Sequence, residues 1–196
     1  MFKPCIIVPV YKHAAQFAAF IPQLKGYDLI IVDDGNDAAQ KAVLKELAAQ
    51  YEAELVSLTT NSGKGVAMLR GFAHALNAGY SHALQIDADG QHDAGDIPKF
   101  MELGAANPGC IINGNPVYDD SVPASRRNGR KITNFWVCIE TLSRDIGDAM
   151  CGFRLYPLKE IAPLVQKGLR FKRMASDIEL IVRAHWRKIK IINLGT

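Results

Sequence analysis

Hydrophobic residues along the chain fall in short runs separated by helical patterns. Several runs are rich in Val and Ile and do not alternate with polar residues, which is typical of strands buried on both faces of a sheet. Seven strands are therefore predicted, at residues 5–10, 29–32, 54–58, 82–86, 110–112, 151–156 and 189–193.

Between these runs, apolar residues recur with helical spacing. Residues 37–50 form one such segment and residues 65–78 form a clearer one. The stripe of the second helix that is predicted to face the core consists of Val66, Leu69, Phe72, Ala73 and Leu76. Alternating strands and helices predict an α/β fold with a mainly parallel central sheet and helices on both faces.

No repeat, low-complexity segment or linker divides the chain, so one domain is expected over residues 1–196. The least regular segment is 113–131, which is polar and contains Pro and Gly. We expect it to be a flexible loop beside a functional site.

Composition and charge narrow the class of protein. The net charge of +3 is too small to indicate a nucleic-acid partner. The four cysteines show no CxxC pair and no zinc spacing, so we interpret them as reduced residues of a cytosolic protein. No run reaches the roughly 18 apolar residues of a membrane-spanning helix. We expect a cytoplasmic protein that is at most peripheral on the cytoplasmic face of a membrane.

Four of the predicted strands lead into polar clusters: "PVYKH", "VDDGND", "NSGKG" and "DADGQH". The carboxyl ends of parallel strands meet at one edge of a sheet, so these side chains are expected around one cleft. "NSGKG" lacks P-loop spacing, and the chain has no GxGxxG motif. Taken alone, "VDDG" is also ordinary turn chemistry, and Lys64 also fits a solvated loop residue.

The cluster after residue 86 carries the strongest chemical signal. Asp87 and Asp89 are two residues apart, so in an extended segment they point the same way. Two carboxylates repel each other unless a cation or a proton lies between them. Asp96 is well placed to cap the helix that begins near Ile97, so capping does not explain Asp87 and Asp89. The pattern favours Mg²⁺ or Mn²⁺ completed by substrate phosphates over an acidic turn.

A basic cluster, Arg126, Arg127 and Arg130, precedes an amphipathic helical pattern. One interpretation is a core helix with a solvated basic start. The other is a set of guanidinium groups that bind a phosphate, at the start of a helix that lies on an anionic membrane surface. The apolar stripe consists of Ile132, Phe135, Trp136, Ile139, Leu142 and Ile146.

Farther along, Asp177 and Glu179 are candidate general bases for a hydroxyl acceptor, whereas a phosphate acceptor is already ionised and needs none. Asp177 also fits a first-turn acid of a helix. His13 and His92 fall in strand-end motifs and are secondary candidates for contact with a phosphate.

The motifs "PVYKH", "VDDGND", "NSGKG", "DADGQH" and "CGFRLYP", in this order, resemble the family-2 glycosyltransferases with the GT-A fold. The nearest branch is the one similar to dolichol-phosphate mannose synthase, and the match runs from about Cys5 to the C-terminus. Relatives usually continue after the last strand, so the resemblance implies that this domain is truncated at its C-terminal end.

The resemblance also implies roles for single residues. Pro9 and Tyr11 would line the pocket of the nucleotide base, Asp34 would hydrogen-bond the base, and Lys64 would lie at the pocket edge. Asp87 would sit near the ribose or the donor sugar. The resemblance further implies that Asp89, with Gln91, holds the Mg²⁺ or Mn²⁺ ion that bridges the diphosphate.

The function expected from these observations is an inverting, metal-dependent glycosyltransferase. Its donor would be a UDP- or GDP-sugar, and its acceptor a lipid-linked phosphate or a membrane-associated glycan or lipid. One alternative is a non-catalytic module that binds nucleotide sugars. A nucleotidyltransferase is disfavoured, because such enzymes normally carry a glycine-rich signature near the first strand and "IIVPVYKHAAQF" has no glycine.

Overall fold

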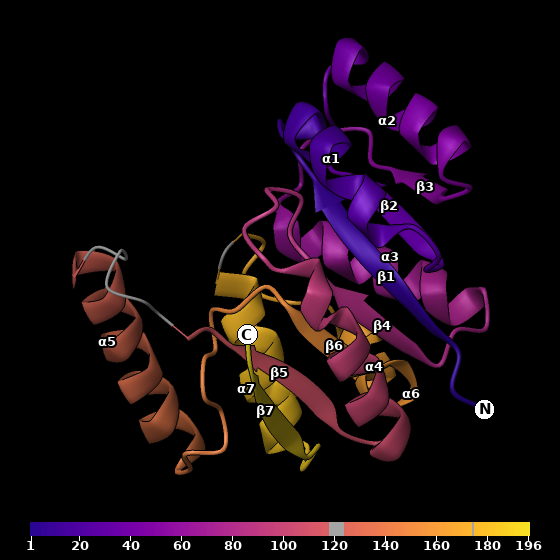
Figure 1. The fold of residues 1–196 in the computed structure, drawn as a ribbon. Helices are drawn as coiled ribbons and strands as arrows, with labels where there is room; N and C mark the ends of the chain where they lie inside the picture. The colour runs from indigo at the N-terminus through magenta and orange to yellow at the C-terminus, as the bar shows by residue number, and fades with distance from the viewer. Residues whose placement is uncertain (118–123, 174) are drawn as a thin grey trace.

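The computed structural model describes residues 1–117, 124–173 and 175–196, with side chains in these ranges other than those of residues 124–128. A central sheet carries helices on both faces, and one long helix stands at its edge (Figure 1). The strands are β1 Pro4–Val10, β2 Leu29–Asp33, β3 Glu54–Ser57, β4 His82–Gln85, β5 Ile111–Asn115, β6 Arg154–Pro157 and β7 Ile191–Gly195. The helices are α1 Ala14–Phe20, α2 Ala38–Gln50, α3 Lys64–Asn77, α4 Ile97–Ala106, α5 Ala124–Thr141, α6 Leu158–Lys167 and α7 Ala175–Trp186, with short 3₁₀ turns η1 Ile21–Leu24 and η2 Ala94–Asp96.

All seven predicted strands are present, and their order in the sheet is β3-β2-β1-β4-β6-β5-β7. The prediction of a mainly parallel sheet is confirmed. The exception among the described strands is β6, which pairs antiparallel with both β4 and β5. β6 also begins later than predicted, at Arg154, because residues 151–153 form the turn that leads into it.

Alternate residues of β1 supply two core layers. Ile6 and Val8 face the layer that contains α1, α2 and α4, whereas Cys5 and Ile7 face the layer that contains α3, α6 and α7. Because successive side chains of a strand point to opposite faces, one uninterrupted apolar strand fills both layers. Burial on both sides explains why the runs in the sequence show no polar alternation.

The stripe that α3 buries differs from the predicted one. Phe72 is buried as expected, but Val66, Leu69, Ala73 and Leu76 are only partly buried. Instead, small residues of α3 lie against the sheet: Ala67, Gly71 and Ala75. A Cβ at Gly71 would lie 2.7 Å from Ile7 Cγ2 and 3.1 Å from Val32 Cγ2. The close approach of α3 to the sheet therefore selects small side chains, which a search for large apolar residues does not find.

The structure also corrects the predictions for residues 113–146. The predicted loop is shorter, because β5 continues to Asn115 and α5 begins at Ala124; residues 118–123 lie outside the described ranges. Of the predicted stripe, only Ile146 is buried, in a small cluster with Val137 and residues of α7. The remaining stripe residues are exposed: Ile132, Phe135, Trp136, Ile139 and Leu142. For these five residues the interpretation as a core helix was wrong.

No helix within the described ranges is long and apolar enough to cross a bilayer. The four cysteines are free thiols, and Cys5, Cys110 and Cys151 are buried.

We expect Gly71→Val to lower the free energy of unfolding by about 1–3 kcal/mol, because the added side chain forces α3 away from Ile7 and Val32. Urea denaturation followed by circular dichroism measures this change. Gly109→Val is the matched control, because a Cβ at Gly109 meets no atom within 4 Å. Equal stability of the two variants would contradict the close packing described for α3.

Candidate active site

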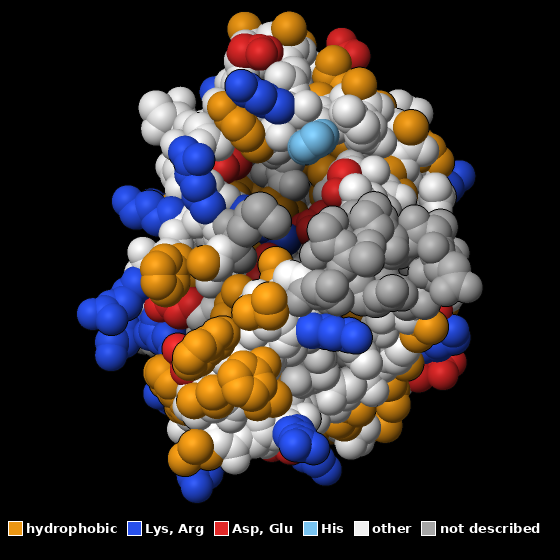
Figure 2. Space-filling view, turned by 90° about the vertical axis from the view of Figure 1, so that its left-hand side faces the viewer, with side chains coloured by type: hydrophobic (Ala, Val, Ile, Leu, Met, Phe, Trp, Pro, Cys, Tyr) orange, Lys and Arg blue, Asp and Glu red, His pale blue; other side chains and the backbone are white. Residues whose placement is uncertain are grey.

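A cavity of about 520 Å³ opens beside the carboxyl ends of β1, β2 and β4. It brings together all of the predicted donor-binding residues and the predicted metal ligand Asp89, whereas Gln91 is not among its lining residues. The surface is hollowed on the face that Figure 2 shows, and charged side chains of both signs lie in the hollow. The lining residues are Pro9, Val10, Tyr11, His13, Asp34, Asn61, Gly63, Lys64, Asp87, Ala88, Asp89 and Arg173.

Asp34 organises the loop before α3. Its Oδ1 accepts a hydrogen bond from Ser62 N at 2.8 Å, and its Oδ2 accepts from Gly63 N at 2.9 Å and from Asn61 Nδ2 at 3.0 Å. Asp34 is 2% exposed, so these bonds replace hydration that its carboxylate loses on burial. In this structure Asp34 fixes the "NSGKG" loop, in addition to lining the cavity where the nucleotide base was predicted.

The turn around Asp34 depends on glycine. Gly35 has φ +71°, and a Cβ there would lie 2.1 Å from the backbone carbon of Thr60. The neighbouring Asp33 carboxylate accepts bonds from Asn36 N and Asn36 Nδ2, at 2.9 Å and 2.8 Å. Thus "VDDGN" is a turn, as its composition suggested, and the turn aims one carboxylate at the cavity.

Lys64 lies between two carboxylates. Its Nζ is 2.6 Å from Asp87 Oδ1 and 2.9 Å from Asp177 Oδ2. The other oxygen of Asp177 accepts a hydrogen bond from Gln85 Nε2 at 2.9 Å. This ion cluster joins the start of α3, the residues after β4 and the start of α7, so Lys64 is not a solvated loop lysine.

The cluster shifts the pKa of Lys64 and of Asp87. Burial acts to lower the pKa of Lys64, but the charges of Asp177 and Asp87 outweigh it, and the net pKa is raised. Burial, together with the charge of Asp177, raises the pKa of Asp87, although the Lys64 ammonium acts to lower it. Lys64 therefore stays charged at neutral pH, and its ammonium is what keeps two carboxylates together here.

The position of Asp87 depends on close contact with Gly152. A Cβ at Gly152 would lie 2.3 Å from Asp87 Oδ2, so no other residue fits there without moving the carboxylate. Gly152 belongs to the "CGFRLYP" motif, which explains why a glycine precedes β6. The motif thus supports the site from the neighbouring strand.

The segment after Asp87 forms a turn that exposes Asp89. Its Oδ1 accepts a hydrogen bond from Gln91 N at 3.0 Å, across Gly90 with φ +71°. In the described ranges no group of three or more His, Cys, Asp or Glu side chains is arranged to hold a metal ion. An exposed carboxylate with few neighbouring ligands fits Mg²⁺ or Mn²⁺, which take their remaining ligands from phosphate oxygens and water.

The two secondary histidines differ in position. His13 lines the cavity. His92 packs instead against Phe153, with ring centroids 5.2 Å apart, and burial lowers its pKa despite the nearby charges of Asp87 and Asp89.

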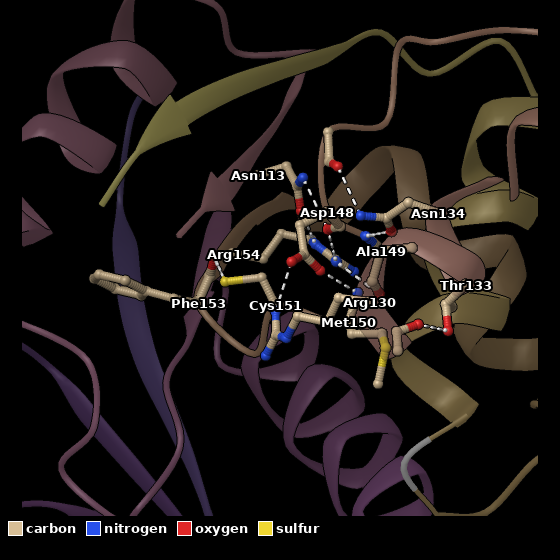
Figure 3. A network of polar contacts seen from close by, with 12 residues as sticks. Asn113, Arg130, Thr133, Asn134, Asp148, Ala149, Met150, Cys151, Phe153 and Arg154 are labelled. Carbon is tan, nitrogen blue, oxygen red and sulfur yellow. Dashed lines mark hydrogen bonds and ion pairs between the residues drawn. The ribbon is translucent and has the colours of Figure 1, made fainter. Parts of the chain in front are cut away.

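The predicted acceptor residues lie on α5. Arg130 NH1 forms an ion pair with Asp148 Oδ2 at 2.6 Å, and Asp148 is 3% exposed. Figure 3 shows Asp148 within a network that also holds Asn113, Asn134 and Arg154. This network fastens α5 to the end of the sheet. Arg126 and Arg127 belong to α5, but their side chains lie outside the described part.

The candidate bases have well-defined partners. Both oxygens of Asp177 are engaged by Lys64 and Gln85, as described above. Glu179 Oε2 accepts hydrogen bonds from Arg170 N at 2.8 Å and Phe171 N at 2.9 Å, while Oε1 pairs with Arg183 at 2.9 Å. Burial acts to raise the pKa of Glu179, but these bonds outweigh it and lower the pKa. Neither residue lines the cavity.

Two residues of this region, Arg154 and Arg173, are not among those predicted from the sequence. Arg154 is fully buried, and it donates to Asn113 Oδ1, Tyr156 Oη and the backbone oxygen of Asp177. An arginine inside the apolar run "CGFRLYP" is a signal that such a network exists, because a buried guanidinium needs partners. Arg173 gave no comparable signal, since its place in the cavity depends on the tertiary fold.

We expect Lys64→Met to lower the free energy of unfolding by about 3 kcal/mol, because Asp87 and Asp177 then face each other without a cation. The double variant Lys64→Met/Asp177→Asn should recover part of this loss, since one of the two like charges is gone. Urea denaturation measures both effects.

Lys99→Met is the control for the loss of a lysine, because Lys99 pairs with Asp96 at the surface. It should cost less than about 1 kcal/mol. A double variant no more stable than Lys64→Met would show that charge repulsion is not the cause of the loss.

Several curated proteins with similar sequences have names that refer to dolichyl phosphate or undecaprenyl phosphate. The polyprenol monophosphomannose synthase of Mycolicibacterium smegmatis is 25% identical over 194 residues, which cover 93% of this chain and 72% of the relative. The human dolichyl-phosphate beta-glucosyltransferase is 26% identical over 186 residues, covering 86% of this chain and 55% of the relative. The chain thus spans only about half the length of some relatives that it matches.

Solved structures share the fold. The glucosyl-3-phosphoglycerate synthase of Mycobacterium tuberculosis, in complex with Mn²⁺, UDP and glucosyl-3-phosphoglycerate, superposes with a TM-score of 0.71 at 16% identity. The match covers 100% of this chain and 71% of that one. The GT-A fold that the sequence motifs implied is confirmed.

The model of the family described as "Glycosyl transferase family 2" matches residues 5–161, which is most of the chain. The branch implied by the motifs is confirmed by the polyprenyl-phosphate relatives. The protein belongs to glycosyl transferase family 2.

Proposed function

We propose that this domain transfers a sugar from a nucleotide-diphosphate donor to a lipid-linked phosphate, with Mg²⁺ or Mn²⁺ and with inversion at the anomeric carbon. The observation that carries the proposal is that one cavity is lined by four charged residues of the predicted site: Asp34, Lys64, Asp87 and Asp89. The names of the relatives support a polyprenyl-phosphate acceptor. The solved neighbour that contains Mn²⁺ and UDP supports a metal and a nucleotide diphosphate.

Each residue predicted for the donor site has a part in this proposal. Pro9 and Tyr11 provide a wall for the nucleotide base, and Asp34 supplies carboxylate oxygens beside it. Lys64 holds Asp87 in place near the ribose or the sugar. Asp89, with Gln91 in the same turn, would hold the metal. A divalent cation stabilises the negative charge that develops on a leaving diphosphate.

The contacts of the candidate bases favour a phosphate acceptor. A hydroxyl acceptor needs a group that removes its proton, and both oxygens of Asp177 and of Glu179 already have partners. A phosphate oxygen is ionised at neutral pH and needs no base. It can attack the anomeric carbon from the face opposite to the leaving diphosphate, and such a displacement inverts that centre. Arg126 and Arg127, at the start of α5, are the guanidinium groups that we assign to the acceptor phosphate.

The exposed stripe of α5 supports contact with a membrane surface. Phe135 and Trp136 are 60% and 59% exposed, in the middle of the stripe. Figure 2 shows hydrophobic side chains gathered on this face of the molecule, with Lys and Arg side chains around them. This pattern is typical of a helix that lies in the interface of an anionic bilayer. A lipid-linked acceptor would then enter the site from the membrane.

Metal-dependent binding of the nucleotide tests the donor site. We expect UDP or GDP to bind in the presence of Mn²⁺ and to bind at least about tenfold more weakly in EDTA, a difference of about 1.4 kcal/mol. Asp89→Asn should lose the same factor, because one metal-binding carboxylate is removed. Isothermal titration calorimetry measures these affinities.

Asp93→Asn is the control for the change in charge near Asp89. Asp93 caps the short turn η2 through Gly95 N and does not line the cavity, and Asn is an equally good cap. Absence of binding of both nucleotides to the wild type would overturn the proposed function. Binding without sugar transfer to a polyprenyl phosphate would favour a non-catalytic module that binds nucleotide sugars.

Sedimentation with vesicles that contain anionic phospholipid tests the membrane contact. We expect Phe135→Ser/Trp136→Ser to reduce the bound fraction at least about threefold, since it removes the largest apolar area of the stripe. Phe171→Ser is the control, because Phe171 is 56% exposed but lies outside α5. Equal binding of the two variants would exclude α5 as the membrane contact.

A further inference from the structure

The lining of the cavity contains more acidic than basic side chains, which bears on how it could bind a diphosphate. Asp34, Asp87 and Asp89 line the cavity, and Asp177 lies directly behind Lys64. A nucleoside diphosphate adds further negative charge, so its phosphates need cationic partners besides a metal ion.

Lys64 is a poor candidate for that partner. Its ammonium already contacts Asp87 at 2.6 Å and Asp177 at 2.9 Å. To bind a phosphate it would have to leave two carboxylates that repel each other without it. The second Lys or Arg of the cavity lining is Arg173.

Arg173 is exposed, and within the described ranges it forms no ion pair with a carboxylate. It lies close to the start of α3, because a Cβ at Gly63 would be 3.3 Å from Arg173 Cγ. The planar guanidinium group matches phosphate oxygens with two parallel hydrogen bonds. Arg173 is therefore a cation in the lining of the cavity whose guanidinium group is available to bind a phosphate.

Arg173 lies at the end of the segment 168–173, and hydrogen bonds hold this segment at both of its ends. Near Arg173, Lys172 O accepts a hydrogen bond from Gly65 N at 2.9 Å, which joins the segment to α3. At the other end, Arg183 NH1 donates to Gly168 O at 2.6 Å.

Glu179 holds the middle of the same segment. Its carboxylate accepts bonds from the backbone N–H groups of Arg170 and Phe171, and it pairs with Arg183. These bonds tie residues 168–171 to α7. Glu179 is therefore placed to set the position of the segment and, through it, of Arg173.

We propose that Arg173 binds the diphosphate of the nucleotide donor, and that Glu179 is a positioning residue that fixes the segment carrying it. This inference rests on the proposed function, because it assumes that a nucleotide diphosphate occupies the cavity. It assigns to Glu179 a role other than that of a general base.

The test compares a nucleoside diphosphate with its nucleoside, for whichever base the wild type binds. We expect Arg173→Ala to weaken UDP or GDP binding at least about tenfold in the presence of Mn²⁺, because a charge-assisted pair with phosphate is lost. Uridine or guanosine binding, measured by ligand-observed NMR, should change less than twofold, because the nucleoside carries no phosphate. Arg173→Lys should recover part of the loss.

Lys172→Ala is the matched control, because it removes an exposed cation from the same segment but keeps the backbone oxygen that contacts Gly65. It should leave both affinities nearly unchanged. Glu179→Gln should reproduce the selective loss in diphosphate affinity. Adding Glu179→Gln to Arg173→Ala should then cause little further loss, since both changes act through one guanidinium group.

The outcomes separate this inference from the proposed function. A wild type that binds neither UDP nor GDP overturns the proposed function. A wild type that binds, with Arg173→Ala equal to Lys172→Ala, overturns only the inference. Equal losses of nucleoside and diphosphate affinity in Arg173→Ala also overturn it, because they show support of the pocket's shape and not contact with phosphate.

Discussion

The ammonium group of Lys64, held between Asp87 and Asp177, is the interaction on which the candidate site depends. It joins three segments that are far apart in the sequence: the start of α3, the residues after β4 and the start of α7. The cluster is partly buried, so the attraction is screened less than at a surface, and loss of the cation would leave like charges in contact. The same ion therefore places Asp87 at the cavity and fastens the first turn of α7 behind it. The geometry of the candidate site and the local fold have one physical cause here.

Small residues make this arrangement possible. Gly71 lets α3 approach the sheet, and this brings Lys64, at the start of the same helix, to the ends of β1 and β4. Gly152 leaves room for the carboxylate of Asp87, and Gly63, with φ +93°, lets the backbone of Lys172 come close. A Cβ at any of these glycines would meet an atom within 3 Å. Close packing around the ion cluster is therefore a condition for its geometry as well as a source of stability.

Much of this architecture is encoded locally. The seven apolar runs predicted the seven strands, because a strand that is buried on both faces can be recognised from its own unbroken apolar sequence. The clustering of Asp34, Lys64, Asp87 and Asp89 followed from the rule that parallel strands end at one edge. Features that depend on contacts between distant segments were not predictable in this way. The antiparallel direction of β6, the small-residue stripe of α3, the partner of Arg130 and the place of Arg173 all belong to this group, because each is set by what lies opposite in space.

The cavity and the exposed face of α5 suggest how donor binding and acceptor binding would be divided in the proposed function. On the proposed donor side, Lys64 holds the carboxylates of Asp87 and Asp177 in one cluster, and the carboxylate of Asp34 accepts three hydrogen bonds from the loop before α3. On the proposed acceptor side, α5 presents an exposed apolar stripe, and its Arg130 pairs with Asp148, whose backbone oxygen accepts a hydrogen bond from Asn113 of β5. A rigid polar donor site beside an apolar surface suits an acceptor with an ionised head and a hydrocarbon tail. A free sugar hydroxyl would need a base, and the carboxylates of Asp177 and Glu179 are already committed to other contacts. The arrangement therefore favours a phosphate nucleophile on chemical grounds, independently of any relative.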